Sequence, residues 1–263
     1  MSAPHAQTRG TTGLPAPGSE QHHAPWCALN GQVHLWWFSL CLPPTALEGQ
    51  LAALASGERS RLATMPPVAA ARATTCRAAV RRLLGRYTDM EASALTISTS
   101  PHGKPRLADC HGITFSIAHC RDIGVLAVSR QFDVGVDIEP SERPVDLDMF
   151  ARCVLSEAEA RRLASMPPQD RRIHALRIWT RKEAVLKAAG TGLDRPLRLI
   201  DVDDIAQPLQ LAGEQRCWQV QDIPLAHGRW LAAVAFDARM ENPPIVARHY
   251  PDTVMSEQET EGV

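Results

Sequence analysis

The sequence predicts an α+β protein made of two similar α/β subdomains related by a pseudo-two-fold axis, each a small antiparallel sheet with helices. The first observation is a repeat, since RLATMPP at residues 61–67 recurs as RLASMPP at residues 162–168. The second is that a helical pattern and then strand-like runs follow Met-Pro-Pro in each half. A repeat this long indicates a duplicated subdomain rather than a solenoid unit.

The repeat extends outward without gaps at a constant offset of 101 residues. It aligns residues 54–67 with 155–168, and it places VHLWWF (33–38) opposite VGVDIE (134–139). We therefore predict a first subdomain at 29–132 and a second at 133–240, with a disordered N-terminal tail at 1–28 and a peripheral C-terminal tail at 241–263. A cleft between two such subdomains is where a small ligand usually binds.

Composition excludes several broad classes of protein. The chain has 263 residues and a net charge of −1, which gives no general attraction to nucleic acid or to acidic membranes. Its seven cysteines are odd in number and contain no C-x-x-C, so neither a disulfide framework nor a zinc site is supported, and a reducing, cytoplasmic compartment follows. The pair His22-His23 is a candidate metal site, with a solvated tail as the alternative. The longest apolar run, at 33–42, stops at Pro43-Pro44 and is too short to span a membrane.

Each half then gives the same order of elements. In the first half the apolar run at 33–42 predicts a buried strand, residues 69–87 a helix, and ITFSIAH and IGVLAVS two strands. In the second half VGVDIEP predicts a strand, residues 170–190 a helix, and CWQVQ and RWLAAVAF two strands. Lys187 in the last helical turn and Gly190 just beyond it are typical of a helix C-terminus.

The strand VGVDIEP (134–140) carries two acids on one face. Successive side chains of a strand alternate, so Val134, Val136 and Ile138 line one face while Asp137 and Glu139 project from the other. Neighbouring carboxylates repel, and a bound Mg²⁺ would remove that repulsion. The alternative is an exposed, acidic strand end.

The helix around IWTRKEAVLK supplies a second set of candidate residues. Trp179, Glu183 and Lys187 are spaced four residues apart and share one helical face. A surface ion pair and a core tryptophan are the alternatives, but a carboxylate beside apolar surface needs a partner such as a metal or a lysine. Opposite these acids the repeat places Arg82 and the aromatic strand 33–38, so one subdomain is suited to a metal and the other to an anionic ligand.

Four motifs in order resemble a known family. VGVDIEP and the later WTRKEAVLK look like the signature of the 4'-phosphopantetheinyl transferases of the surfactin-synthetase-activating type. HGKPRL (102–107) is similar to the family's G-K-P segment, and FSIAHC (115–120) is similar to its F-N-x-S-H-S segment. The resemblance covers about residues 55 to 195.

The resemblance implies transfer of the phosphopantetheine arm of coenzyme A to a serine of an apo acyl or peptidyl carrier protein, with release of 3',5'-ADP. It implies that Asp137, Glu139 and Glu183 hold Mg²⁺ against the pyrophosphate. Glu183 is also the candidate base for the serine proton, and Lys187 would pair with a phosphate oxygen. The second subdomain would then be the catalytic, metal-binding one.

The first subdomain would hold the nucleotide and its phosphates. The family match places Lys104 and His119 there, although a satisfied histidine at a strand end is the alternative for His119. Arg72 is the first candidate for the 3'-phosphate, because an arginine fork suits a phosphate dianion. Other candidates are Arg59, Arg61 and Arg77, and solvated helical arginines are the alternative for all four.

The chain departs from the family pattern at Ser116, Ala118 and Cys120, where Asn, Ser and Ser are usual. For Cys120 a small buried thiol is the alternative to a reactive one. The rival functions are a Mg²⁺-dependent phosphohydrolase and a non-catalytic carrier-binding protein. This two-subdomain type is associated with secondary metabolism, including polyketides and nonribosomal peptides. The duplication predicts a monomer, and the net charge of −1 predicts no nucleic-acid partner.

Overall fold

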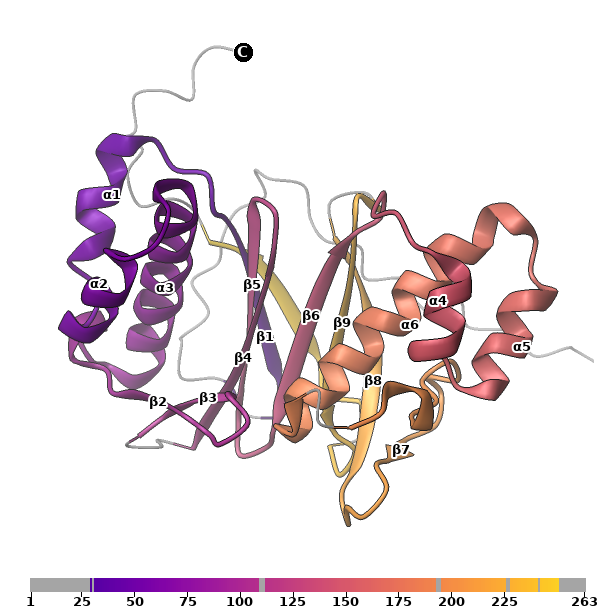
Figure 1. Cartoon of the computed structure of the whole chain (residues 1–263). Helices are drawn as coiled ribbons and strands as arrows, with labels where there is room; N and C mark the ends of the chain where they lie inside the picture. Colours follow the sequence, from indigo (N-terminus) through magenta and orange to yellow (C-terminus); the bar gives the residue numbers. More distant parts are fainter. Residues whose placement is uncertain are drawn as a thin grey trace, which may run out of the picture.

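The computed structural model describes residues 29, 31–108, 112–192, 195–225, 228–240 and 242–250. Two sheets lie side by side in the middle of the molecule, with helices α1, α2 and α3 on one outer side and α4, α5 and α6 on the other (Figure 1). The architecture is therefore α+β, as the sequence predicts. The predicted tail at 1–28, with His22 and His23, lies outside the described residues.

The first half begins with a strand, continues through three helices and ends in a hairpin. Its elements are β1 (Val33–Ser39), α1 (Pro44–Leu51), α2 (Ser56–Leu62), α3 (Pro67–Thr88), η1 (Ala92–Ala94), β2 (Ile97–Thr99), β3 (Pro105–Leu107), β4 (Ile113–Cys120) and β5 (Ile123–Arg130). The main sheet has the order β10-β1-β5-β4, and β2 pairs separately with β3.

The second half follows the same order of elements with one strand fewer before its hairpin among the described residues. Its elements are β6 (Val134–Pro140), α4 (Leu147–Cys153), α5 (Glu157–Ser165), α6 (Pro168–Ala189), η3 (Leu197–Leu199), β7 (Leu209–Gln210), β8 (Cys217–Leu225) and β9 (Trp230–Asp237). The sheet order is β6-β9-β8-β7, so in both halves the first strand pairs antiparallel with the last strand of the following hairpin.

The helix boundaries follow the sequence signals closely. Helices α3 and α6 are both 22 residues long, and each begins at the second proline of its Met-Pro-Pro segment, Pro67 and Pro168. Proline suits this first position because it has no N–H to leave unpaired. Helix α6 ends at Gly190, which has a φ of 71° and is its C-cap. The predicted signals Pro, Lys187 and Gly190 therefore lie where the helix begins and ends.

The C-terminal segment differs from the prediction of a peripheral tail from 241 onward. Strand β10 (Ile245–His249) joins the first sheet, where it runs parallel to β1. The first sheet is thus mixed rather than purely antiparallel. The sequence hid this strand because IVARH is half-buried at a sheet edge and carries two basic residues, so it lacks a clear apolar alternation. Residues 251–263 lie outside the described part.

Three apolar clusters form the layers. One packs α3 on the outer face of the first sheet through Trp36 and Phe38, and one packs α6 on the outer face of the second sheet. The third lies between the two sheets and includes Val33 and Leu35 of β1 and Val134 and Val136 of β6. Alternate residues of β1 and β6 thus face the partner sheet and the helix.

The outer face of β6 is arranged for close approach of α6. A Cβ atom on Gly135 would lie 2.0 Å from the carbonyl oxygen of Ala184 and 2.3 Å from the nitrogen of Ala188, so only glycine fits between strand and helix. Asp137 and Glu139 follow on the same face, which directs both carboxylates toward α6. The two predicted acidic segments are therefore adjacent in the fold.

The two halves use the same ion pair to attach the short helix to the long one. Arg81 of α3 pairs with Glu58 of α2 at 2.6 Å, and Lys182 of α6 pairs with Glu159 of α5 at 2.6 Å. Both pairs lie at the repeat offset of 101 residues. Lys182 and Glu159 are fully buried.

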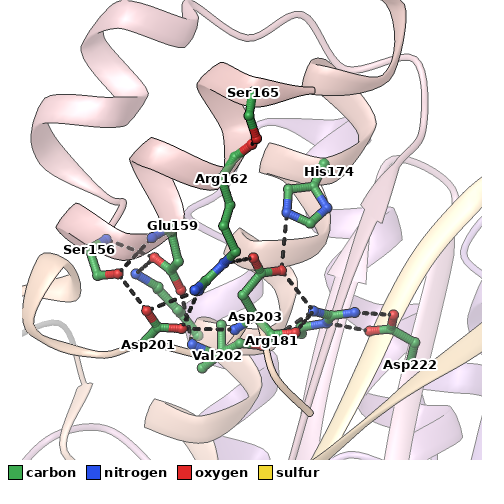
Figure 2. Close-up of polar contacts among 11 residues, drawn as sticks. Ser156, Glu159, Arg162, Ser165, His174, Arg181, Asp201, Val202, Asp203 and Asp222 are labelled. Atoms are coloured by element: carbon green, nitrogen blue, oxygen red, sulfur yellow. Dashed lines mark hydrogen bonds and ion pairs between the residues drawn. The ribbon is translucent and has the colours of Figure 1, made fainter. Parts of the chain in front are cut away.

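Glu159 is the centre of a larger polar network in the second half (Figure 2). It accepts hydrogen bonds from the backbone N–H groups of Ser156 and Val202, which satisfies the N-terminus of α5 and fixes the segment after η3. Nearby, Arg181 of α6 donates to both carboxylate oxygens of Asp222 on β8 at 2.8 and 2.6 Å. The network therefore binds α5, α6 and the second sheet together.

A buried polar triad lies between β1 and α3. The Nδ1 atom of His34 lies 2.7 Å from the hydroxyl of Tyr87, and the indole N–H of Trp36 donates to that hydroxyl at 2.7 Å. Burial, and then the nearby Arg248, lower the pKa of His34 from 6.5 to about 4. His34 is therefore neutral in the folded protein, and in the tautomer that donates from Nε2 to Gln32 its Nδ1 atom accepts a hydrogen bond from the Tyr87 hydroxyl.

We expect this histidine to make the protein acid-sensitive. Because folding lowers the pKa of His34, the unfolded chain binds the proton more tightly, and stability falls as the pH drops from about 6.5 to about 4. The loss amounts to about 3 kcal/mol. Urea unfolding across this pH range checks it against His34→Gln, which keeps an acceptor for Tyr87 and does not titrate. Parallel pH profiles for the two proteins would contradict the assignment.

The described residues also bear on the predictions about disulfide bonds and membrane-spanning helices. The cysteines that the structure describes, at positions 41, 76, 120, 153 and 217, are all free thiols. In the described ranges no helix combines the length and apolarity needed to cross a bilayer.

Candidate active site

Strand β6 and helix α6 bring the predicted acids and lysine together. The ammonium of Lys187 donates to Oδ1 of Asp137 at 2.6 Å, where the Asp137 side chain is nearly buried. Burial raises the pKa of Asp137, and the opposing effect of Lys187 is smaller. This ion pair connects the predicted strand motif to the predicted helix motif, and it lies in a position with little access to water.

Glu139 has two donors on a single oxygen. The indole N–H of Trp179 donates to Oε1 of Glu139 at 3.0 Å, and the guanidinium of Arg143 pairs with the same oxygen. Burial raises the pKa of Glu139, and the neighbouring Asp137 charge acts in the same direction despite Arg143. Trp179 is therefore more than a core residue, because its indole N–H donates to an acid of the site and orients it.

Glu183 completes the acidic group. Burial and then the charge of Asp137 raise the pKa of Glu183, while Lys187 lowers it by a smaller amount. Its Oε1 atom and Oδ2 of Asp137 are buried and make no hydrogen bond to any part of the chain that the structure describes. Two desolvated carboxylate oxygens without donors are costly, and they are the feature that a bound cation would satisfy.

The arrangement of the acids and their neighbouring cations determines whether a metal ion fits this site. Among the described residues no three His, Cys, Asp or Glu side chains are gathered as a ready metal cage. Lys187 and Arg143 instead supply the positive charge next to Asp137 and Glu139. The carboxylate donors and the two unsatisfied oxygens suit Mg²⁺, which prefers carboxylates and retains water or phosphate ligands. Binding of the ion would require Lys187 and Arg143 to move away from Asp137 and Glu139.

A cavity of about 250 Å³ opens beside Glu183 and Lys187. Its wall includes Ser116 and Ile117 from β4 of the first half, Leu186 and the glycine turn after α6 from the second, and the residues His102, Gly103, Lys104 and Pro105. The cavity therefore lies where the two halves meet, and both apolar and charged side chains line it.

Lys104 is buried in the wall of this cavity and is already paired. Its ammonium donates to Oδ1 of Asp133 at 2.9 Å and to the carbonyl of Ala188 at 2.7 Å. Burial nevertheless lowers its pKa, although Asp133 acts in the opposite direction. In the structure Lys104 links the two halves through these two hydrogen bonds. The predicted nucleotide contact of Lys104 stays a prediction.

His119 lies at the end of β4, within electrostatic reach of the acids. Loss of water, followed by repulsion from Lys187 and Arg77, lowers its pKa. The Nη1 atom of Arg77 on α3 is buried and makes no hydrogen bond within the described chain. Arg77 and Lys187 thus place positive charge on this part of the site, whereas His119, with its lowered pKa, is neutral at neutral pH.

The remaining predicted arginines lie apart from the cavity. Arg59 and Arg61 are exposed on α2, and Arg72 on α3 pairs at 2.6 Å with Asp122 in the turn between β4 and β5. None of the three lines the 250 Å³ cavity, and neither do Arg77 and His119. The proposed contacts of the arginines to the 3'-phosphate stay predictions.

The departures from the family pattern have structural roles. The hydroxyl of Ser116 accepts the backbone N–H of Val136 at 3.1 Å, so it links β4 to β6 across the two halves. Ala118 is packed in the apolar cluster between the sheets. The thiol of Cys120 is partly buried, and its pKa is raised by burial and by Glu139, which is the opposite of activation.

Sequence reasoning missed Arg143, Asp133 and the role of Lys182. Arg143 follows Glu139 by four residues, a spacing that signals an ion pair only on a helix, and here a turn provides the contact. Lys182 stands next to Glu183 in the motif but is directed to Glu159 and the carbonyls of Val154 and Leu197. Nothing in the motif sequence distinguishes Lys182, which stabilises the fold, from the neighbouring residues of the site.

Comparisons with known proteins agree with this geometry. The family described as the 4'-phosphopantetheinyl transferase superfamily matches residues 133–235. The chain is 31% identical to the 4'-phosphopantetheinyl transferase HetI of Nostoc sp., over 63% of this chain and 71% of that protein. It is 29% identical to the 4'-phosphopantetheinyl transferase Sfp of Bacillus subtilis, over 45% of this chain and 51% of that protein.

A shorter match is 33% identical to the 4'-phosphopantetheinyl transferase AcpT of Escherichia coli, over 34% of this chain and 45% of that protein. The family match spans β6, α6 and most of β9, and so includes Asp137, Glu139, Glu183 and Lys187. With the fold of two halves and the acids at their junction, the chain belongs to the 4'-phosphopantetheinyl transferase superfamily of transferase enzymes.

Proposed function

We propose that this protein transfers the 4'-phosphopantetheine arm of coenzyme A to a serine of an apo acyl or peptidyl carrier protein, with Mg²⁺, and releases 3',5'-ADP. The single observation that carries the proposal is the group formed by Asp137, Glu139, Glu183 and Lys187 beside the cavity between the halves. Family membership supports the reaction class.

The residues of the site match the demands of this reaction. A pyrophosphate linkage is attacked by a neutral alcohol, so the site must neutralise phosphate oxygens and accept the hydroxyl proton. Asp137, Glu139 and Glu183 would hold Mg²⁺, which when bound would neutralise charge on the pyrophosphate and the leaving phosphate.

Glu183 is the candidate base because burial raises its pKa and its Oε1 atom makes no hydrogen bond to the residues that the structure describes. Lys187 would exchange Asp137 for a phosphate oxygen as the anion arrives. Arg77 would extend the positive charge toward the rest of the coenzyme, and the neutral His119 would donate a hydrogen bond to a phosphate. The domain assignment of the nucleotide to the first half and the catalytic acids to the second is part of this proposal.

The test is intact-mass spectrometry of apo carrier proteins incubated with this protein, coenzyme A and Mg²⁺. We expect a mass gain of one phosphopantetheine that disappears with EDTA and with Asp137→Ala. Consumption of coenzyme A without gain on any carrier would favour a phosphohydrolase. Carrier binding without consumption would favour a non-catalytic carrier-binding protein.

A further inference from the structure

We propose that Arg143 is a built-in counter-ion of Glu139, which a divalent cation must displace, so that Arg143 sets the metal affinity of the free protein. The inference rests on the proposed function, because it takes Asp137, Glu139 and Glu183 as the metal-binding acids. It concerns a residue outside the motifs that suggested those acids.

The contacts of Glu139 place Arg143 where a metal would compete. Arg143 pairs with Oε1 of Glu139, the same oxygen that accepts the indole N–H of Trp179. The Glu139 side chain is 14% exposed, whereas the Arg143 side chain is 39% exposed. The guanidinium also lies 5.5 Å from the centre of the Trp179 ring. The arginine therefore caps the solvent side of a nearly buried acid.

The loop that carries Arg143 is held in place, so the side chain is the part that can move. The backbone N–H of Arg143 donates to the carbonyl of Pro140 at 3.0 Å, and Arg172 of α6 donates to the carbonyls of Ser141 and Arg143. A half-exposed, long side chain on a fixed loop stays close to Glu139 yet can leave it for water. Such a tethered cation competes at high local concentration.

Charge counting indicates why this competition matters. Lys187 faces Asp137 from α6 and Arg143 faces Glu139 from the loop, so the two cations leave one uncompensated negative charge when all three acids are ionised. A divalent cation binds less tightly to a site of one net negative charge than to one of two, which is the charge left when Arg143 is removed and Lys187 stays. Lys187 belongs to the proposed machinery, whereas Arg143 has only this contact with the acids.

The test is Mn²⁺ binding to the full-length protein without coenzyme A, followed by the loss of the electron paramagnetic resonance signal of free Mn²⁺. We expect Arg143→Gln to bind Mn²⁺ about tenfold more tightly than the wild type, because it removes a partly buried competitor. Arg143→Lys keeps the charge and is expected to stay within about threefold of the wild type. In all of these proteins Asp137→Asn should weaken binding.

A matched control removes the same charge nearby without touching the acids. Arg121 pairs with Glu142, the neighbour of Arg143, and both side chains are more than half exposed. We expect Arg121→Gln to change Mn²⁺ affinity less than twofold. A second readout is Trp179 emission, obtained by subtracting the spectrum of Trp179→Phe, which should change when Mn²⁺ displaces Arg143 from the ring.

The outcomes separate the inference from the function on which it rests. If the wild type binds Mn²⁺ in an Asp137-dependent manner and Arg143→Gln binds no more tightly, the counter-ion role is wrong while the metal site stands. If Arg121→Gln tightens binding as much as Arg143→Gln, a general charge effect replaces the specific one. If no variant binds Mn²⁺, the metal assignment fails together with the inference, whatever the carrier assay gives.

Discussion

Replacing Glu183 by Gln is expected to lower the rate of phosphopantetheine transfer at least about a thousandfold, since it removes both a proposed metal-binding oxygen and the proposed base. Gln has nearly the same volume, so the cavity keeps its shape. The amide carries no charge and does not accept a proton from the carrier serine at neutral pH. Single-turnover intact-mass spectrometry of a carrier measures the rate directly.

The same substitution is expected to leave the fold as stable as the wild type, or more stable. Burial and the charge of Asp137 both raise the pKa of Glu183, so the ionised side chain costs free energy that neutral Gln does not. Urea unfolding measures this. A loss of activity that came with a large loss of stability would indicate a structural role instead.

The control for Glu183→Gln is Glu142→Gln. Glu142 is an exposed acid on the loop after β6, paired with Arg121. It lies three residues from Glu139 in the sequence but contributes no oxygen to the site, and we expect transfer within about twofold of the wild type. If Glu183→Gln retained transfer within tenfold of the wild type, Glu183 would be neither the base nor a metal ligand.

Replacing Lys182 by Met is expected to lower the free energy of unfolding by about 3 to 5 kcal/mol, the typical cost of breaking a buried ion pair from one side. The ammonium of Lys182 donates to Glu159 at 2.6 Å and to the carbonyls of Val154 and Leu197 at 2.6 and 3.0 Å. Methionine fills the space but leaves all three acceptors without this donor. Urea unfolding measured by circular dichroism gives the change.

Two comparisons isolate the cause of this destabilisation. Lys182→Met combined with Glu159→Gln should lose less than the sum of the two single changes, because the double variant has no unpaired buried charge. Arg161→Met breaks an exposed pair with Glu157 on the same helix α5 as Glu159, and it is expected to cost less than about 0.5 kcal/mol. A cost below about 1 kcal/mol for Lys182→Met would contradict the buried-pair assignment.

These two variants also separate neighbouring positions of one motif. Glu183 faces the cavity and Lys182 faces α5, since adjacent helical residues point about 100° apart. The expected results are therefore a rate effect without a stability effect at Glu183, and a stability effect at Lys182. A motif alone does not make this distinction.

Signals confined to a few neighbouring residues let the sequence determine much of the framework. The prolines after each methionine set where α3 and α6 begin, and Gly190 sets where α6 ends, because proline and glycine act through their own backbone geometry. Alternation in VGVDIEP placed Asp137 and Glu139 on one face. The repeat offset aligned the segment of β1 with the segment of β6 from the sequence alone.

Only the tertiary structure decided which partner each charge takes. Nothing in the sequence separates Lys104, which pairs with Asp133, from Lys187, which pairs with Asp137, and nothing in it assigns Arg143 to Glu139. Strand β10 likewise needed the edge of β1 to become a strand. Ion pairs and strand pairing join residues that are distant in sequence, and they depend on how the chain packs. Caps, breaks and alternation are local, so a single sequence displays them directly, together with its internal repeat.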